Sequence, residues 1–261
     1  IMDPNALHIW PRGGYMMLAF PGPDGSFTAT LFLPLKGDHK MIWGFEELDT
    51  WTRQSAFMEA NFPDVTPLIP HLEEEFRDNP VGPMGTVRCK RWHHGGKALL
   101  IGDAAHAIVP FHGQGVNSAL EDCTTLDSIL DDKPESWEIA FQALQERRKE
   151  NTDAIAQMAL DAYHVMRESV RHRDFLLRKA LERELEIRHP GRFVARYSLV
   201  MFHRIPYTEA YARGRVQSGI LDELLQGKEE LTDVDLQQAA QLVNERLDEV
   251  SPTGSPAFGS A

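Results

Sequence analysis

The feature that most restricts the fold is the glycine-rich run from Gly102 to Asn117, which separates two different hydrophobic patterns. Before it, residues 98–101 form a short apolar run, and this predicts a buried strand. After it, apolar residues recur every three or four positions, as in an amphipathic helix: Val116, Ala119, Leu120, Cys123, Leu126 and Leu130. The sequence therefore predicts a strand, a glycine loop and a helix in succession.

A loop of this kind is suited to bind an electron-rich ring such as a flavin. Glycines let backbone N–H groups approach a ligand, and the N-terminus of the following helix offers a positive field. Asp103, at the end of the predicted strand, is placed to accept hydrogen bonds from ribityl or ribose hydroxyls. Taken one by one, the glycines indicate only ordinary turns. The length of the run favours the flavin site.

The N-terminal part is expected to combine a sheet with short helices. A β-hairpin is predicted over residues 7–33, and because both of its faces are apolar, either one face lines a pocket or the sheet is covered on both sides. Prolines divide the helical stretch 46–76, and residues 86–92 predict another strand before a turn at 93–96. The buried side of the helical stretch is expected to be Phe57, Ala60, Phe62, Ile69 and Leu72.

The C-terminal part is expected to be a helical bundle. Helices are predicted over 136–170, 173–189, 192–213 and 236–247, and the residues after 250 have the composition of a flexible tail. Together with the N-terminal sheet, this makes the predicted fold class mixed α+β.

Charge and composition exclude several kinds of partner. The 27 lysines and arginines against 39 acidic residues give a net charge of −12, so nucleic acid is not an expected partner. Apolar runs are far shorter than the roughly 20 residues of a membrane span, and neither a signal peptide nor a membrane anchor is expected. Two cysteines suit a reducing compartment. We expect a cytoplasmic protein, and the chain reads as a fragment of a longer one.

Two other groups of residues are weaker evidence for a functional site. His93 and His94 are adjacent without carboxylate or cysteine company, so a solvated turn is favoured over a metal site, and no metal is expected. Asp103, His106 and Ser118 suggest a hydrolase triad, but the sequence has no nucleophile elbow. We therefore set a hydrolase aside.

The run Gly102–Asn117 resembles the second flavin-binding motif of the single-component flavin-dependent aromatic hydroxylases related to p-hydroxybenzoate hydroxylase. Other segments look like the kynurenine 3-monooxygenase branch of that family: 7–12, 24–28, 30–32, 121–123 and 202–205. The resemblance runs in order from residue 7 to about 213. It implies the C-terminal part of an enzyme that hydroxylates L-kynurenine at the ring 3-position with FAD, NADPH and O₂.

The resemblance also implies the site residues. FAD would be bound by Gly102, Asp103, Pro110, Gly113, Gln114, Gly115, Val116 and Asn117. The substrate pocket would be lined by Leu7, Leu18, Phe20, Phe32, Pro110, Phe111 and His112, with Tyr197 on the substrate carboxylate. No side chain is expected to act as a catalytic acid or base. The implied division of the chain is a substrate-domain sheet with connecting helices (1–95), an FAD-contacting strand, loop and helix (96–133), a helical domain (134–250) and a tail (251–261).

The sequence departs from the family pattern in two places. Ala162 stands before Tyr163 where the family commonly has a substrate-binding asparagine. No Gly-x-Gly-x-x-Gly motif follows a strand, so the N-terminal Rossmann unit that holds the FAD diphosphate is expected to be a further part of the same protein. Two alternatives stay open: another aromatic hydroxylase of this family, or a non-catalytic module that retains the scaffold.

Overall fold

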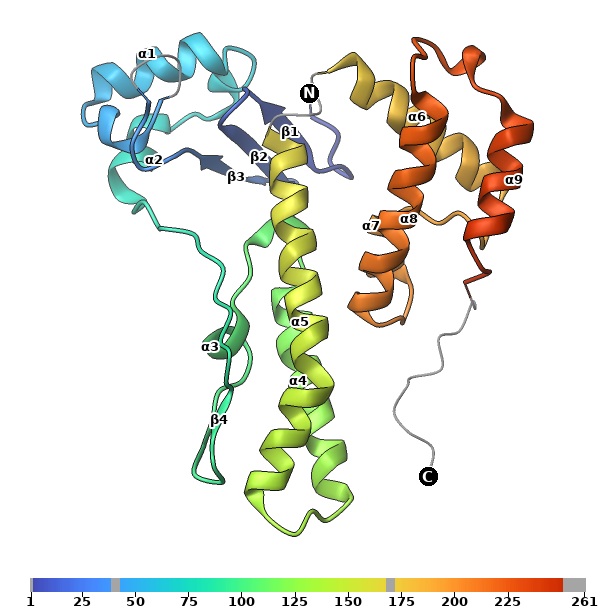
Figure 1. Ribbon diagram of the computed structural model, residues 1–261. Coiled ribbons are helices and arrows are strands. Elements are labelled where there is room, and N and C mark those ends of the chain that lie inside the picture. Colours follow the sequence, from blue (N-terminus) through green and yellow to red (C-terminus); the bar gives the residue numbers. More distant parts are fainter. Residues whose placement is uncertain (1, 39–42, 168–171, 251–261) are drawn as a thin grey trace. The chain divides into compact units, whose positions relative to one another are not determined.

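The computed structural model describes residues 2–38, 43–167 and 172–250, and its fold is the expected mixture of helices and small sheets (Figure 1). It divides into two compact units. The first unit comprises residues 1–84 and 163–171, and the second comprises 85–162 and 172–261. Among the described helices, none combines the length and the apolar character that crossing a membrane requires.

The first unit contains a three-stranded antiparallel sheet in the order β1-β2-β3. Its strands are His8–Pro11, Met16–Pro21 and Phe27–Phe32. The predicted hairpin is therefore a meander with one more strand than expected. Gly13 and Gly14 adopt positive φ values of 73° and 131°, which turns the chain between the first two strands.

The two faces of this sheet differ. Tyr15 and Met17 face a core shared with the short helices of the unit. Those elements are η1 (Phe45–Glu47), α1 (Trp51–Asn61), η2 (Thr66–Leu68) and α2 (Leu72–Asp78). The prediction that prolines divide residues 46–76 into short helices is confirmed. The prediction that Ala60 is buried is wrong: Phe57 and Met58 are the buried residues of α1, and Ala60 is exposed.

The second unit begins with an extended segment that forms less sheet than predicted. Residues 86–92 are not a strand: Val87 N–H donates to Ala107 O at 2.8 Å and Cys89 N–H to Ala105 O at 3.1 Å, without a continuous ladder. The reason is that the facing segment includes the end of a helical turn. Residues 98–101 are not a buried strand either. Only β4 (His93–His94) and β5 (Ala98–Leu99) pair, and Leu100 is 40% exposed.

The glycine loop follows β5 and leads into a pair of long helices. It contains α3 (Asp103–His106) and η3 (Pro110–His112), and it is followed by α4 (Gly115–Asp131) and α5 (Trp137–Arg167). The helix predicted after Gly115 is confirmed, but its buried face is not the predicted one. Val116 and Leu120 are 73% and 59% exposed, whereas the buried residues are Ser118, Asp122, Thr125 and Ile129.

The remaining helices form the C-terminal bundle, in which α8 contacts α6, α7 and α9 (Figure 1). Their bounds are α6 (Arg173–Arg188), α7 (Arg196–Phe202), α8 (Tyr207–Leu225), η5 (Leu231–Asp233) and α9 (Leu236–Arg246). The single helix predicted over 192–213 is two helices, because Pro206 lacks a backbone N–H and restricts the residue before it. The predicted tail 251–261 and the end of the predicted helix 136–170 lie outside the described residues.

Candidate functional site

The glycine loop of the second unit is built around two glycines with positive φ. Gly102 has φ 60° and ψ −140°, and a Cβ placed on it would lie 3.2 Å from the Ala119 Cβ. This close approach lets the chain turn against α4 directly after β5. Gly113 is left-handed with φ 66° and ψ 21°, and no heavy atom lies within 4 Å of a Cβ placed on it. The space beside Gly113 is therefore open for another group to approach the backbone.

The N-terminus of α4 is next to this open space. Its Gln114 N-cap makes no side-chain cap, and Ser118 N–H donates to Gln114 O at 2.9 Å. The N–H groups of the three residues before Ser118 have no intrahelical acceptor, as at every helix start. These N–H groups can therefore stabilise a negative charge, helped by the helix dipole.

The predicted cofactor-binding residues differ in exposure. Five of them are open to a ligand: Asp103, Pro110, Gly113, Val116 and Asn117. Gly102 and Gln114 are buried, and Gly115 is half-buried. The carboxylate predicted to bind ribityl or ribose hydroxyls is thus exposed in the first turn of α3.

The Gln114 side chain is occupied by neighbouring protein groups. Its Oε1 accepts hydrogen bonds from Tyr207 OH at 3.1 Å and from Asn117 Nδ2 at 3.0 Å. Its Nε2 donates to the Met201 Sδ at 3.1 Å. Because the amide is buried and bonded in this way, a contact from Gln114 to a ligand has to use the backbone.

His112 and Tyr197, both predicted to bind substrate, lie together in the second unit. Their rings stack with centroids 5.5 Å apart and planes inclined by 21°. Tyr197 is 53% exposed, whereas His112 is buried, and the His112 Nδ1 has no hydrogen-bond partner among the described residues. Burial lowers the pKa of His112, and the positive charge of Arg196 lowers it further. The imidazole is therefore neutral near pH 7.

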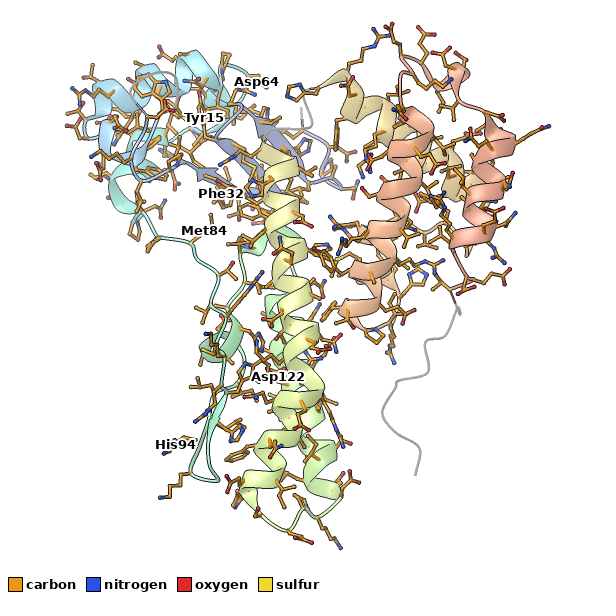
Figure 2. All side chains as sticks on the ribbon, in the orientation of Figure 1. Tyr15, Phe32, Asp64, Met84, His94 and Asp122 are labelled. Atoms are coloured by element: carbon orange, nitrogen blue, oxygen red, sulfur yellow. The ribbon has the colours of Figure 1, made fainter. Side chains whose placement is uncertain are left out.

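Beneath the loop lies a charged cluster that the sequence interpretation missed. Asp122, labelled in Figure 2, is fully buried on α4. Its Oδ2 accepts hydrogen bonds from the Gly102 N–H at 3.1 Å and from the His106 Nε2 at 2.5 Å, and its Oδ1 accepts one from the Arg148 Nε at 2.8 Å. Burial alone would raise the pKa of Asp122, but these hydrogen bonds outweigh burial and lower it. Asp122 is thus a fully bonded anion.

One sequence signal was available for this cluster. Ser118, Asp122, Thr125 and Ile129 follow the helical spacing of a buried stripe as regularly as the apolar residues do. The partner that makes such a stripe stable, Arg148, is remote in sequence and carries no local signal. For Tyr207 and Met201, which hold Gln114, we find no local signal either.

Among the other predicted pocket residues, Phe111 is buried in η3 of the second unit, and Leu7, Leu18, Phe20 and Phe32 belong to the first unit. Leu18 pairs with Ile9 and Thr30, and Phe32 pairs with Met16, so Leu18 and Phe32 share one face of the sheet. This face is opposite to the one that carries Tyr15 and Met17; Figure 2 labels Phe32 and Tyr15. Phe20 is on the same face as Leu18, two residues further along the strand. Leu18 is buried, and Phe20 and Leu7 are 45% and 43% exposed.

Comparison with known proteins first defines a class. The family described as an FAD binding domain matches residues 64–138, a stretch that includes the whole glycine loop and α4. The part of the chain that the sequence interpretation assigned to FAD therefore lies within a recognised FAD-binding sequence family.

The chain is also similar to curated relatives that share one name. The chain is 49% identical over 246 residues to a kynurenine 3-monooxygenase of Myxococcus xanthus. This match covers 94% of the chain and 52% of the relative. It is 41% identical over 238 residues to one of Legionella pneumophila and 44% identical over 247 residues to one of Xanthomonas axonopodis pv. citri. These two matches cover 91% and 95% of this chain, and 52% and 53% of the relatives.

The chain is therefore a homologue of the kynurenine 3-monooxygenases, and it spans about half the length of the curated relatives it matches. The resemblance inferred from the sequence motifs is confirmed.

Proposed function

We propose that the protein is an FAD-dependent monooxygenase that hydroxylates L-kynurenine to 3-hydroxykynurenine with NADPH and O₂, a step of tryptophan degradation. The observation that carries the proposal is the open left-handed backbone at Gly113 beside the N-terminus of α4. This geometry lies within the FAD-binding family match, in a chain homologous to kynurenine 3-monooxygenases.

The residues of the loop fit a flavin. The exposed Asp103 carboxylate can accept hydrogen bonds from flavin hydroxyls, and the open Gly113 lets a flat ring approach the backbone. The N–H groups of Gly115, Val116 and Asn117 would stabilise negative charge on the reduced ring. Pro110 and Gly102 would complete the cofactor contacts, Gly102 by placing the turn. When bound, FAD supplies the electron transfer from NADPH and the activation of O₂.

The substrate side is proposed from the same residues that the sequence indicated. Tyr197 would donate its phenol hydrogen to the substrate carboxylate, and the neutral His112 ring would support Tyr197 by stacking. Leu7, Leu18, Phe20, Phe32, Pro110 and Phe111 would contact the aromatic ring. Their role is to exclude water and to hold the ring in place, so no acid or base is required of them.

Two further proposals concern the rest of the protein. The diphosphate of FAD would be held by an N-terminal nucleotide-binding part, because the present sequence contains no Gly-x-Gly-x-x-Gly fingerprint. Within the chain, we propose the same functional segments as above: a substrate-domain sheet with connecting helices at 1–95, an FAD-contacting segment at 96–133 and a helical domain at 134–250. A cytoplasmic location is proposed from the cysteine content alone.

The test uses the full-length protein. Purified protein should show a flavin absorption spectrum, and L-kynurenine should stimulate NADPH oxidation with equal formation of 3-hydroxykynurenine. NADPH oxidation and product should be measured in the same reaction. Oxidation that kynurenine stimulates without hydroxylated product would identify kynurenine as an effector only.

A second candidate is the hydroxylation of a different aromatic ring by the same chemistry. It is favoured by Ala162, which replaces a polar substrate contact by a methyl group. Flavin in the protein without any response to kynurenine would support this candidate, and absence of flavin would support a non-catalytic module.

A further inference from the structure

Arg148 of α5 binds three residues on one side of α4: Ser118, Glu121 and Asp122. Its Nη1 contacts the Glu121 Oε2 at 2.6 Å, and its Nε contacts the Asp122 Oδ1 at 2.8 Å. Its Nη2 donates to the Ser118 backbone O at 3.1 Å and to the Ser118 Oγ at 3.4 Å. The Arg148 side chain is only 8% exposed. One buried guanidinium therefore fixes the side of α4 that faces α5.

The first branch of contacts leads from Arg148 to the start of the glycine loop. The Asp122 Oδ1 accepts a hydrogen bond from Arg148, and its Oδ2 accepts hydrogen bonds from the Gly102 N–H and the His106 ring. Gly102 and His106 flank Asp103 in the single turn of α3. The His106 ring also packs on Trp92, with centroids 5.0 Å apart. The position of Asp103 is thus set by groups on both sides of it that bind the same buried carboxylate.

The second branch leads from Arg148 to the end of the loop. Arg148 binds the Ser118 backbone O and Oγ, and the Ser118 N–H donates to the Gln114 O at 2.9 Å. The Tyr207 hydroxyl donates to the Gln114 Oε1, which also accepts from Asn117. Gln114 and Asn117 bracket the start of α4. Arg148 therefore holds the first turn of α4 through Ser118, next to the Gln114 side chain that Tyr207 fixes.

We propose that Arg148 is a positioning residue that holds both ends of the Gly102–Asn117 loop, through Asp122 at its start and through Ser118 at its end. It touches neither cofactor nor substrate and acts through these partners. Its effect on the loop follows from the protein structure alone, whereas the effect on flavin rests on the proposed function.

The chain contains a matched control for this arrangement. Arg178 of α6 binds Asp222, and it also binds the Ser218 backbone O at 3.2 Å and the Ser218 Oγ at 2.6 Å on α8. As with Arg148, the serine stands four residues before the aspartate on the helix that is bound. The contacts of Arg178 that the structure shows are within α6 and α8, away from the loop.

The test is hydrogen exchange in the full-length protein, followed over peptides that cover 102–107 and 113–118. Asp122→Asn should speed exchange about tenfold at 102–107, since its amide donor would then face the groups that donate to Asp122. Tyr207→Phe should speed exchange by a similar factor, about tenfold, at 113–118 and leave 102–107 within about twofold. Arg148→Lys should affect both segments, because an ammonium cannot bind all three partners in one geometry.

The flavin readout is the dissociation constant of FAD, measured by fluorescence. Arg148→Lys should raise it by about tenfold, and Arg178→Lys should leave both it and the two exchange rates within about twofold of wild type. Unchanged exchange at both segments in Arg148→Lys would overturn the proposal, as would faster exchange spread evenly over α6, α8 and α9. If the wild-type protein binds no FAD, the proposed function fails, and the exchange rates still decide the positioning role.

Discussion

His112 and Tyr197 stack face to face across the boundary between the glycine loop and α7, with ring centroids 5.5 Å apart. The stack places a residue at the end of η3 against one in the first turn of a helix some 85 residues later in the chain. Because burial keeps His112 neutral, the pair presents the phenol of Tyr197 without a competing positive charge on the imidazole. The geometry suits a tyrosine that donates to a carboxylate.

Tyr197→Phe should raise the KM for kynurenine about five- to thirtyfold and change kcat little, for a loss of about 1–2 kcal/mol. The phenylalanine ring keeps the stack on His112, so only the phenol hydrogen bond is removed. That bond is present in the ground state and in the transition state alike, and its loss is a uniform-binding effect. Steady-state kinetics of 3-hydroxykynurenine formation measure the split.

Tyr197→Leu is the companion variant, since it removes the ring as well. It should lose a further amount of about 0.5–1.5 kcal/mol relative to Tyr197→Phe, the worth of an aromatic pair. Equal kinetics for the two variants would show that the stack does not contribute to binding. A kcat that falls as steeply as kcat/KM in Tyr197→Phe would contradict the uniform-binding role.

Asp103→Ala should weaken FAD binding about ten- to a hundredfold, because it removes the carboxylate that we propose accepts hydrogen bonds from flavin hydroxyls, worth about 1.5–3 kcal/mol. Its dissociation constant is measured by flavin fluorescence. Asp127→Ala removes another exposed carboxylate from the same unit and should bind FAD as wild type does. A common response of both variants would indicate a general charge effect instead of a contact.

Gly102→Ala and Gly113→Ala should differ in their effect on stability. Both have positive φ, but a Cβ at Gly102 also meets Ala119 at 3.2 Å, whereas the space at Gly113 is open. We expect a loss of about 2–3 kcal/mol for Gly102→Ala and about 1–2 kcal/mol for Gly113→Ala in the free energy of unfolding. Urea denaturation gives both values. A larger loss for Gly113→Ala than for Gly102→Ala would mean that α4 shifts at Ala119 to accommodate the new Cβ without a loss of stability.

Asp122→Asn should destabilise the protein by about 3–5 kcal/mol at pH 7, because it leaves Arg148 without a full partner in a buried site. The hydrogen bonds to Asp122 hold its folded pKa below the ordinary value of 3.8. The stabilisation is therefore complete above the unfolded pKa and is lost as pH falls through the folded pKa.

The measurement is the free energy of unfolding of both proteins from pH 7 down to pH 2. The difference between wild type and Asp122→Asn should stay constant to about pH 4 and shrink below it. A difference that shrinks between pH 7 and pH 5 would assign the titration to another group.

Local patterns predicted the helix α4 but not its orientation. The three- and four-residue spacing is a property of the helix, so Val116 and Leu120 indicated it correctly. Which side is buried depends on what the helix packs against. Here the partner is a buried arginine on α5, and the polar residues Ser118 and Asp122 face inward to meet it. Side-chain hydrophobicity alone therefore cannot predict that the polar side of α4 is the buried side.

The candidate site was predictable to the same limited extent. The glycines and Asp103 lie in one continuous segment, and their spacing and resemblance were sufficient to select them. Contacts between distant segments left no local trace, as with Tyr207 on Gln114. At residues 86–92 the local pattern predicted a strand that the structure does not form, because the β-forming residues there have only scattered backbone hydrogen-bond partners.

The contacts of Arg148 set the size of the piece that can be exchanged between related proteins. A chimera that receives only residues 102–117 would separate the loop from Asp122 and Arg148, which lie outside the exchanged segment. A graft of 102–148 carries the arginine and both carboxylates, although Tyr207 still has to be matched by the recipient. For engineering, the transferable unit is therefore this longer segment and not the glycine loop.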